Sequence, residues 1–211
     1  MIQAVVSDFG GVLTSPLLEA FDRVQDRIDV RPEMYRDAMA YCLQHDGVHP
    51  LFAVERGEIS ERDFLTRVER GLAETAGVRV SLHGFGEQLM SAMGPNWEMF
   101  DHYRSLHRER GLRFALCTNN VREWESRWRA LLPIDELFEV VVDSAFVGTR
   151  KPEPEIYAIT LERLGLPAAA CAFVDDLEHN VEGAREAGMH GIVFHDNAQA
   201  IAELTALLTQ R

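Results

Sequence analysis

Asp8 is the first residue of the chain whose type and position could do chemistry. It follows the apolar run at residues 4–6 and precedes the paired glycines Gly10 and Gly11, a pattern typical of a buried strand that ends in a tight turn. A carboxylate at such a strand end loses its hydration, so it needs a cation or hydrogen-bond donors beside it. Because glycines let backbone N–H groups approach a ligand, the pattern predicts a nucleophilic Asp8 in a turn that binds phosphate and a metal. An acid that only caps the turn is the alternative.

Two further acids follow another apolar run. Residues 172–174 lead directly into Asp175 and Asp176. Acids at a buried strand end that face a third acid on a neighbouring strand repel one another unless a cation or protons intervene. Carboxylate oxygens are ligands that Mg²⁺ prefers, and bound Mg²⁺ keeps positions for water and phosphate oxygens. The pair therefore predicts a magnesium site, and the alternative is a helix N-cap followed by a surface acid.

Hydroxyl and amide side chains follow the strand predicted at residues 114–117. Thr118, Asn119 and Asn120 stand there, directly before a helical pattern. A helix N-terminus beside a hydroxyl and an amide can hold a phosphate. The alternative is that these residues only cap the helix, with Asn120 as the N-cap and Glu123 three residues on.

Lys151 follows the strand predicted at residues 140–142 and precedes a proline-fixed turn. Pro154 is suited to the first turn of the next helix, so the lysine has a defined position. A phosphate or an acidic cluster could use this cation. A solvated loop lysine is the alternative.

Alternating strands and helices must position these residues. The patterns predict helices at 97–109, 121–132, 155–164, 181–187 and 200–208, and a last strand at 192–194. Short apolar strands separated by helices imply a parallel sheet with helices on both faces. Because ligands of such folds gather at the carboxyl ends of the strands, we expect the four groups of residues to converge there.

The stretch from residue 16 to about residue 94 is helical in pattern, with no convincing strand. Ser60 followed by Asp63 resembles a capping signal, and Gly77 marks a stop. The apolar residues at helical spacing are Leu17, Leu18, Phe21, Val24 and Ile28, then Met34, Ala38, Tyr41 and Cys42, then Phe64, Leu65, Val68 and Leu72. We therefore expect a helical module inserted between the first strand and the rest of the sheet.

Composition limits the class of protein. The chain has 211 residues with 46% hydrophobic content, which supports a normal core, and its net charge of −13 argues against a nucleic-acid partner. Cys42, Cys117 and Cys171 are odd in number and stand in apolar surroundings, so we expect buried free thiols in a reducing compartment, the cytoplasm. No apolar run approaches the roughly 18 residues of a membrane span, so no membrane association is expected.

The combination DFGGVLT, CTNN, RKPEPEIY and FVDDLEHNVEGAREAGM resembles, in order, the four motifs of the haloacid dehalogenase-like (HAD) hydrolase superfamily. The resemblance covers essentially the whole chain and is closest to phosphatases similar to the N-terminal domain of soluble epoxide hydrolases. It implies an α/β fold with a Rossmann-like three-layer core and a parallel sheet of strand order 3-2-1-4-5. The core is expected at residues 1–15 and 95–211, and an inserted helical cap at 16–94.

The resemblance also implies residue roles and a reaction, the magnesium-dependent hydrolysis of a small-molecule phosphomonoester. Asp8 becomes the nucleophile that forms an aspartyl-phosphate, and Lys151 neutralises phosphate and carboxylate charge. Thr118 and Asn119 bind the transferred phosphoryl group. The implied magnesium ligands are Asp8, the Gly10 carbonyl, Asp175 and Asp176, with Asn180 orienting the acids.

One position departs from the pattern of these phosphatases. They usually carry a second Asp two residues after the nucleophile as general acid/base, and this chain has Gly10 there. General acid–base catalysis is commonly worth about 10²–10⁴ in rate, so the substitution predicts a slow enzyme or one that uses good leaving groups. A cap-borne acid could replace it, and His45, Asp46 and His49 are candidates by composition only. The favoured alternative is that they are ordinary surface residues of the cap.

Two other functions stay open, as does the oligomeric state. A catalytically weak HAD fold that serves as a binding module is motivated by Gly10 alone. A 2-haloacid dehalogenase, in which the Asp attacks carbon without a metal, tolerates the missing acid, but the pair Asp175 and Asp176 argues against it. A homodimer is an open alternative to a monomer, because helical caps often bury apolar faces against a partner.

Overall fold

A five-stranded parallel sheet organises the molecule. The computed structural model describes residues 1–17, 19–20 and 30–209. Its strands are β1 (Ala4–Ser7), β2 (Arg113–Thr118), β3 (Val140–Asp143), β4 (Cys171–Asp175) and β5 (His190–Val193). They follow the order β3-β2-β1-β4-β5, and every neighbouring pair is parallel. The predicted α/β fold and strand order are confirmed.

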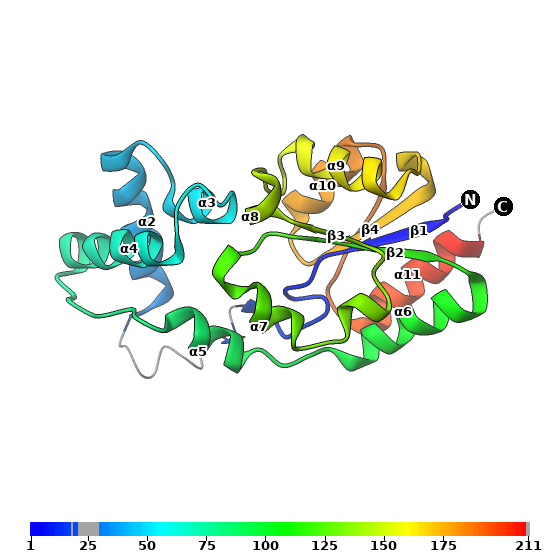
Figure 1. Ribbon diagram of the computed structural model, residues 1–211, viewed down its shortest axis with the longest axis horizontal. Coiled ribbons are helices and arrows are strands. Elements are labelled where there is room, and N and C mark those ends of the chain that lie inside the picture. The colour runs from blue at the N-terminus through cyan, green and yellow to red at the C-terminus, as the bar shows by residue number, and fades with distance from the viewer. Residues whose placement is uncertain (18, 21–29, 210–211) are drawn as a thin grey trace.

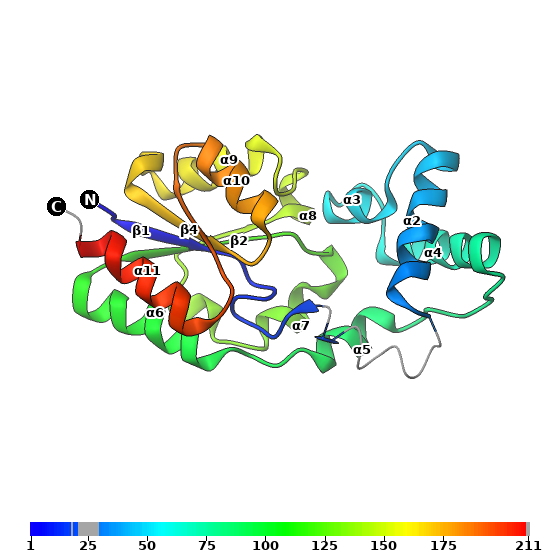
Figure 2. The ribbon, with the colours of Figure 1, turned by 180° about the vertical axis from the view of Figure 1, so that it is seen from behind.

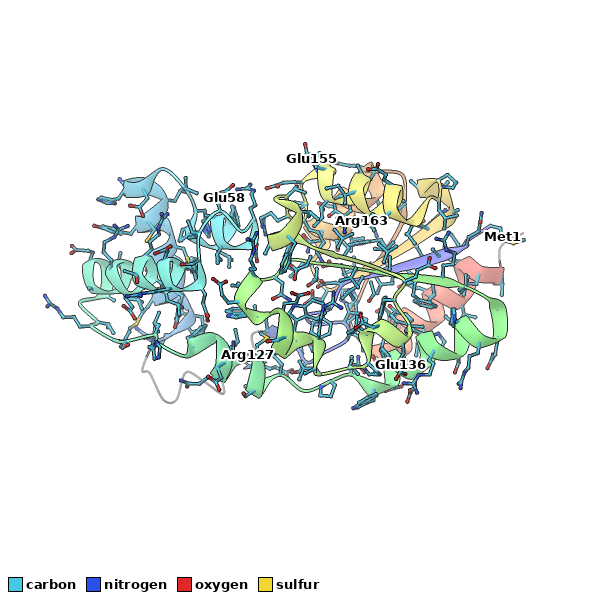
Figure 3. The ribbon with its side chains drawn as sticks, viewed as in Figure 1. Met1, Glu58, Arg127, Glu136, Glu155 and Arg163 are labelled. Atoms are coloured by element: carbon cyan, nitrogen blue, oxygen red, sulfur yellow. The ribbon has the colours of Figure 1, made fainter. Side chains whose placement is uncertain are left out.

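Side chains that alternate along the strands divide the core into two apolar clusters, one on each face of the sheet. Val5 belongs to one cluster, whereas Ala4 and Val6 belong to the other. One face is covered by α6 (Trp97–Arg110), α7 (Glu125–Arg129) and α11 (Asn197–Thr209), and the other by α9 (Pro154–Leu164) and α10 (Glu178–Glu186) (Figure 1). Glu136 and Glu155 mark the two opposite outer surfaces of this three-layer core (Figure 3).

A group of helices lies beyond the carboxyl ends of the strands, away from both termini (Figures 1 and 2). It contains α2 (Pro32–Asp46), α3 (Pro50–Glu55), α4 (Glu61–Ala76) and α5 (Phe85–Ala92). As predicted, the Ser60 side chain caps α4 by accepting a bond from the Asp63 N–H, and Gly77 ends that helix in a left-handed conformation. The predicted helical positions Leu18, Phe21, Val24 and Ile28 lie outside the described residues. The helical insert, called the cap below, is therefore present as predicted.

The two connections between cap and core run side by side. Thr14 forms an antiparallel bridge with Pro95, and the Ser15 N–H donates to the Gly94 carbonyl at 2.8 Å. Both chain crossings thus occur at one place. This arrangement supports the predicted cap boundaries, residues 16–94, which stay a prediction.

The helix predicted at residues 121–132 is wrong in extent and in its cap. The segment forms a 3-10 turn, η1 (Arg122–Trp124), and then the short α7. Val121 is the N-cap, and the Asn120 side chain only accepts a bond from the Val121 N–H. Glu123 makes no capping box with it and instead accepts a bond from the Glu61 N–H at the start of α4. A tertiary contact with the cap has taken the place of the local one.

Two expectations from composition can be compared with the structure. Cys42, Cys117 and Cys171 are free and buried, as predicted. Among residues 1–17, 19–20 and 30–209, no helix combines the length and apolar character that crossing a membrane requires.

Candidate active site

The register of the sheet places Asp8 beside Asp175. Ser7 of β1 pairs with Val174 of β4, so the next residues, Asp8 just after β1 and Asp175 at the end of β4, lie at the same level. The Asp8 N–H continues this pairing by donating to the Val174 carbonyl at 2.8 Å. Both carboxylates are buried, with Asp8 7% and Asp175 0% exposed. The predicted convergence of these two strand ends is therefore observed.

Lys151 lies between the two acids. Its Nζ is 2.7 Å from Asp8 Oδ1 and 2.6 Å from Asp175 Oδ2, and the residue is 1% exposed. Its backbone is held as firmly, because Asn119 Oδ1 accepts from the Lys151 N–H at 2.8 Å and Asn119 Nδ2 donates to the Lys151 carbonyl at 3.0 Å. The alternative of a solvated loop lysine is thereby excluded. The structure also gives the Asn119 side chain a use that the sequence did not predict.

Asp176 completes a cluster of three carboxylates. Asp8, Asp175 and Asp176 each offer one oxygen, and these oxygens lie within 4.8 Å of one another. Gly11 makes room for the third acid: its φ is +78°, and a Cβ on it would lie 2.1 Å from Asp176 Oδ2. The positive φ favours glycine at this position, and a side chain there would displace the Asp176 carboxylate from the turn.

The charges of the cluster are out of balance. Burial raises the pKa of Asp8 to about 7, opposed by Lys151 and reinforced by the two neighbouring acids. Burial, followed by the charge of Asp175, raises the pKa of Asp176 to about 6. Burial acts to lower the pKa of Lys151, but Asp175 and Asp8 outweigh it and raise the pKa, so the side chain stays an ammonium. When all three acids are ionised, three carboxylates against one ammonium leave two negative charges, which a divalent cation would neutralise.

The oxygens of Asp175 already have several donors. Oδ1 accepts from the Leu177 N–H at 2.9 Å and from Asn180 Nδ2 at 3.0 Å, while Oδ2 accepts from Lys151. Asn180 therefore holds the carboxylate in place, the arrangement expected of a residue that orients an acid. Asp175 is the most saturated of the three acids. A cation at the cluster would find more open coordination at Asp176 and Asp8.

Gly10 and Thr118 lie at the same edge of the sheet. A Cβ on Gly10 would meet no atom within 4 Å, so this position has room for a side chain. Thr118 is buried at the end of β2, in register with Asp143 of β3. Asp143, which sequence reasoning missed, is buried as well and caps α8 (Ser144–Val147) through the Ala145 N–H.

The cap acids and bases singled out in the sequence differ in their surroundings. His45 stacks on Tyr41, and Asp46 pairs with Arg70, so both find partners within the cap. His49 stacks on Phe52 in α3, and burial followed by the charge of Arg150 lowers its pKa. The cap carboxylate that meets the core beside Lys151 is Glu55, which no motif indicated; its Oε2 accepts from Arg150 Nε at 2.5 Å.

A model of the haloacid dehalogenase-like hydrolases matches residues 2–188, which is most of the chain. This chain belongs to the HAD-like hydrolases. Phosphatase MT3486 of Mycobacterium tuberculosis is 37% identical over 94% of this chain and 89% of its own length. Mouse bifunctional epoxide hydrolase 2 is 31% identical over 96% of this chain, which spans only 38% of that longer protein. Both the superfamily and the likeness to epoxide hydrolase are confirmed.

Solved structures of HAD-like proteins share the fold. A HAD family enzyme from Bacteroides thetaiotaomicron, in complex with magnesium and inorganic phosphate, has a TM-score of 0.68 and 21% sequence identity. The alignment covers 95% of this chain and 99% of that one. At this level of identity the likeness shows a common fold.

Proposed function

We propose that this HAD-like hydrolase is a magnesium-dependent phosphatase, which hydrolyses a small-molecule phosphomonoester through an aspartyl-phosphate on Asp8. The observation that carries the proposal is the buried Lys151 ammonium, which contacts both Asp8 and Asp175 at the carboxyl edge of the sheet. An anionic nucleophile can attack an anionic phosphate only where positive charge is fixed beside both. The site provides one such charge in Lys151 and the ligands for another.

The chain's own residues define the steps. Asp8 attacks phosphorus through a carboxylate oxygen, the bond from phosphorus to the leaving oxygen breaks, and that oxygen keeps the electron pair. Water then attacks phosphorus in the aspartyl-phosphate, which restores Asp8 and releases inorganic phosphate. Lys151 stabilises negative charge in both steps. We expect Thr118 and Asn119 to contact the phosphoryl oxygens. Asn119 would do so with N–H groups that are not already bonded to the Lys151 backbone.

The acids fit a divalent cation. Asp8, the Gly10 carbonyl and Asp176 would hold Mg²⁺ directly. Asp175 already accepts hydrogen bonds from Leu177 and Asn180, so it would orient the ligands without contacting the ion. When bound, the ion supplies charge neutralisation and polarises a phosphoryl oxygen. The phosphatase name of the relative and the magnesium and phosphate bound by the structural neighbour support the same assignment.

The proposed site lacks an obvious residue to protonate the leaving oxygen. Gly10 offers no acid to the leaving oxygen, which must therefore take its proton from solvent or from another group. This favours substrates whose leaving alcohol is acidic. An open cleft of about 710 Å³ beside Asp176, lined in part by Thr14, Ser15 and Asn96, gives water access to the site.

The two alternatives are less well supported. A 2-haloacid dehalogenase has no use for three clustered acids, and a binding module has no use for a nucleophile buried against a lysine. Both stay open outcomes of the test below.

Steady-state hydrolysis of p-nitrophenyl phosphate tests the proposal. Its leaving group needs little protonation, so Gly10 does not mask activity. We expect turnover that depends on magnesium and that falls to background in Asp8→Asn, a variant of equal size. Absence of turnover in folded wild-type protein that binds magnesium would contradict the proposal. Turnover retained in Asp8→Asn would contradict the assignment of the nucleophile.

A further inference from the structure

The loop that carries Lys151 is held by the cap as well as by the core. Glu153 lies two residues after the lysine and receives the guanidinium of Arg56, the residue that ends α3 in the cap. Arg56 Nε is 2.9 Å from Oε1 and 3.2 Å from Oε2, and its Nη2 also contacts Oε1. This two-pronged geometry is the strong form of an arginine–carboxylate pair.

A second ion pair involves the residue just before Lys151, and here the core supplies the arginine and the cap supplies the carboxylate. Arg150 of the core donates through Nε to Glu55 of α3, and both side chains are nearly buried, at 11% and 13% exposure. The same guanidinium lies 4.1 Å from the centroid of the Phe52 ring. One basic and one acidic residue of the cap therefore pair with one acidic and one basic residue of the core.

Glu153 also builds the loop itself. Its Oε2 accepts from the Thr149 hydroxyl at 2.9 Å and from the Arg150 N–H at 3.1 Å. A single carboxylate thus ties the cap arginine to the backbone immediately before Lys151. From the opposite side, Asn119 holds the Lys151 backbone. Hydrogen bonds from both sides therefore fix the backbone around Lys151.

We propose that Glu55 and Arg56 are positioning residues for Lys151: cap docking, through the crossed pairs Glu55–Arg150 and Arg56–Glu153, sets the loop at residues 149–153 and thereby places the Lys151 ammonium against Asp8. The inference rests on the proposed function for the role of Lys151 in the reaction. It goes beyond that function in making catalysis depend on two side chains that face the loop from the cap. Glu58, two residues beyond Arg56, marks this segment beside the core (Figure 3).

The physical reason is the cost of leaving these charges unpaired. Arg150 and Glu55 are largely desolvated, so neither can be left without its partner cheaply. If the cap moves away, Arg150 and Glu153 lose their cap partners, and the loop between them loses these two supports. Because two carboxylates bind Lys151 within 2.7 Å, a small shift of its backbone changes the balance between them.

Arg56 variants test the proposal with a matched control. We expect kcat for p-nitrophenyl phosphate, per folded site, to fall slightly in Arg56→Lys, about ten- to a hundredfold in Arg56→Ala, and further in Arg56→Glu. Magnesium affinity should not change, because no ligand is touched. Arg70→Ala, which breaks an arginine–carboxylate pair within the cap, should leave kcat unchanged.

A second readout does not depend on activity. Amide hydrogen exchange should rise in the peptide that contains residues 149–153 in Arg56→Ala and stay at the wild-type rate in Arg70→Ala. If the wild type fails to turn over, the proposed function fails while this exchange pattern still decides whether the cap holds the loop. Equal kcat in Arg56→Ala and Arg70→Ala, or unchanged exchange of the loop in Arg56→Ala, overturns the inference.

Discussion

Lys151 sets the charge balance of the site. It is the one cation in direct contact with the described acidic cluster, and it divides its hydrogen bonds between Asp8 and Asp175. Asp176 receives no such contact from it, and burial raises the pKa of Asp176 to about 6. Asp8 and Asp175 contact the lysine, but burial still raises the pKa of Asp8 to about 7. Both Asp8 and Asp176 therefore gain from a proton or a cation.

Gly10 is the residue at which the account predicts a gain of function. The position has room for a side chain, so we expect Gly10→Asp to fold and to supply the missing proton donor. For an alkyl phosphate, whose leaving group needs protonation, kcat/KM should rise by about tenfold or more, towards the 10²–10⁴ that general acid–base catalysis provides. The gain for p-nitrophenyl phosphate should be smaller.

Gly10→Asn is the control, because asparagine has the same size and shape as aspartate but carries no acidic proton. Equal kcat/KM in the Asp and Asn variants would show that volume, not proton transfer, limits this position.

Residues of the site could be predicted from the sequence where each one ends its own strand. Asp8 and the pair at 175 and 176 were found in this way, because parallel strands bring their carboxyl ends together. Lys151 was found in the connection that follows β3, although α8 separates it from that strand. The partners of the Lys151 loop could not. Glu55 and Arg56 lie 95 and 97 residues from the core residues that they bind, and no local pattern marks charged side chains that pair over such a separation.

At the scale of elements, the contact between α3 and α8 holds the cap to the core. Gly57 follows α3 with a φ of +67°, and a Cβ on it would lie 2.2 Å from the Ala145 carbonyl at the start of α8. The backbone at Gly57 thus packs directly against the backbone at Ala145, and neither segment can move without disturbing the helix next to it. The fit of the cap depends on the absence of a side chain.

We therefore expect Gly57→Ala to displace the cap from its contact with α8. Gly77 provides a matched control, because its φ is also +67° but a Cβ there would meet nothing within 4 Å. Both alanine variants should lose roughly 1 kcal/mol of unfolding free energy from the left-handed conformation, measured by urea denaturation. Only Gly57→Ala should also lower kcat for p-nitrophenyl phosphate. Similar kcat values in the two variants would contradict the role given to this contact.

Helices with a strong local stop signal were predicted well. The helix predicted at residues 121–132 was not, because tertiary contacts shape that segment. Gly77 ends α4 in the left-handed conformation, as its position after a helical pattern indicated. Gly111 and Gly165 end α6 and α9 in the same way. The segment after Asn120 has no comparable signal. Its Glu123 and Trp124 bond to Glu61 of the cap instead, which leaves only short helical turns.

At the scale of the whole molecule, the acidic cluster is a cost to stability that a cation would remove. The folded-state pKa values of Asp8 and Asp176 are raised from 3.8 to about 7 and about 6. The folded protein therefore binds more protons than the unfolded chain between these values. This contribution to stability is fully present below about pH 4 and is lost as the pH rises through 6 and 7.

Magnesium should therefore stabilise the protein most at neutral pH and above. At a concentration a hundredfold above Kd, we expect a gain in unfolding free energy of about 2.7 kcal/mol, seen as a higher Tm. The gain should shrink towards pH 5, where protons compete for the same oxygens. It should be largely lost in Asp176→Asn. An equal rise in Tm for wild type and this variant would place the cation elsewhere.

The most direct test of the central claim is to find the phosphoryl group on Asp8. Wild-type protein turning over p-nitrophenyl phosphate with magnesium would be quenched in acid at a series of short times, digested with trypsin and analysed by mass spectrometry. We expect a phosphorylated peptide 1–23 with the modification on Asp8. It should form before the steady state, because Gly10 leaves its hydrolysis without a general base. Turnover in the same samples with phosphate on another residue, or on none at any time, would contradict it.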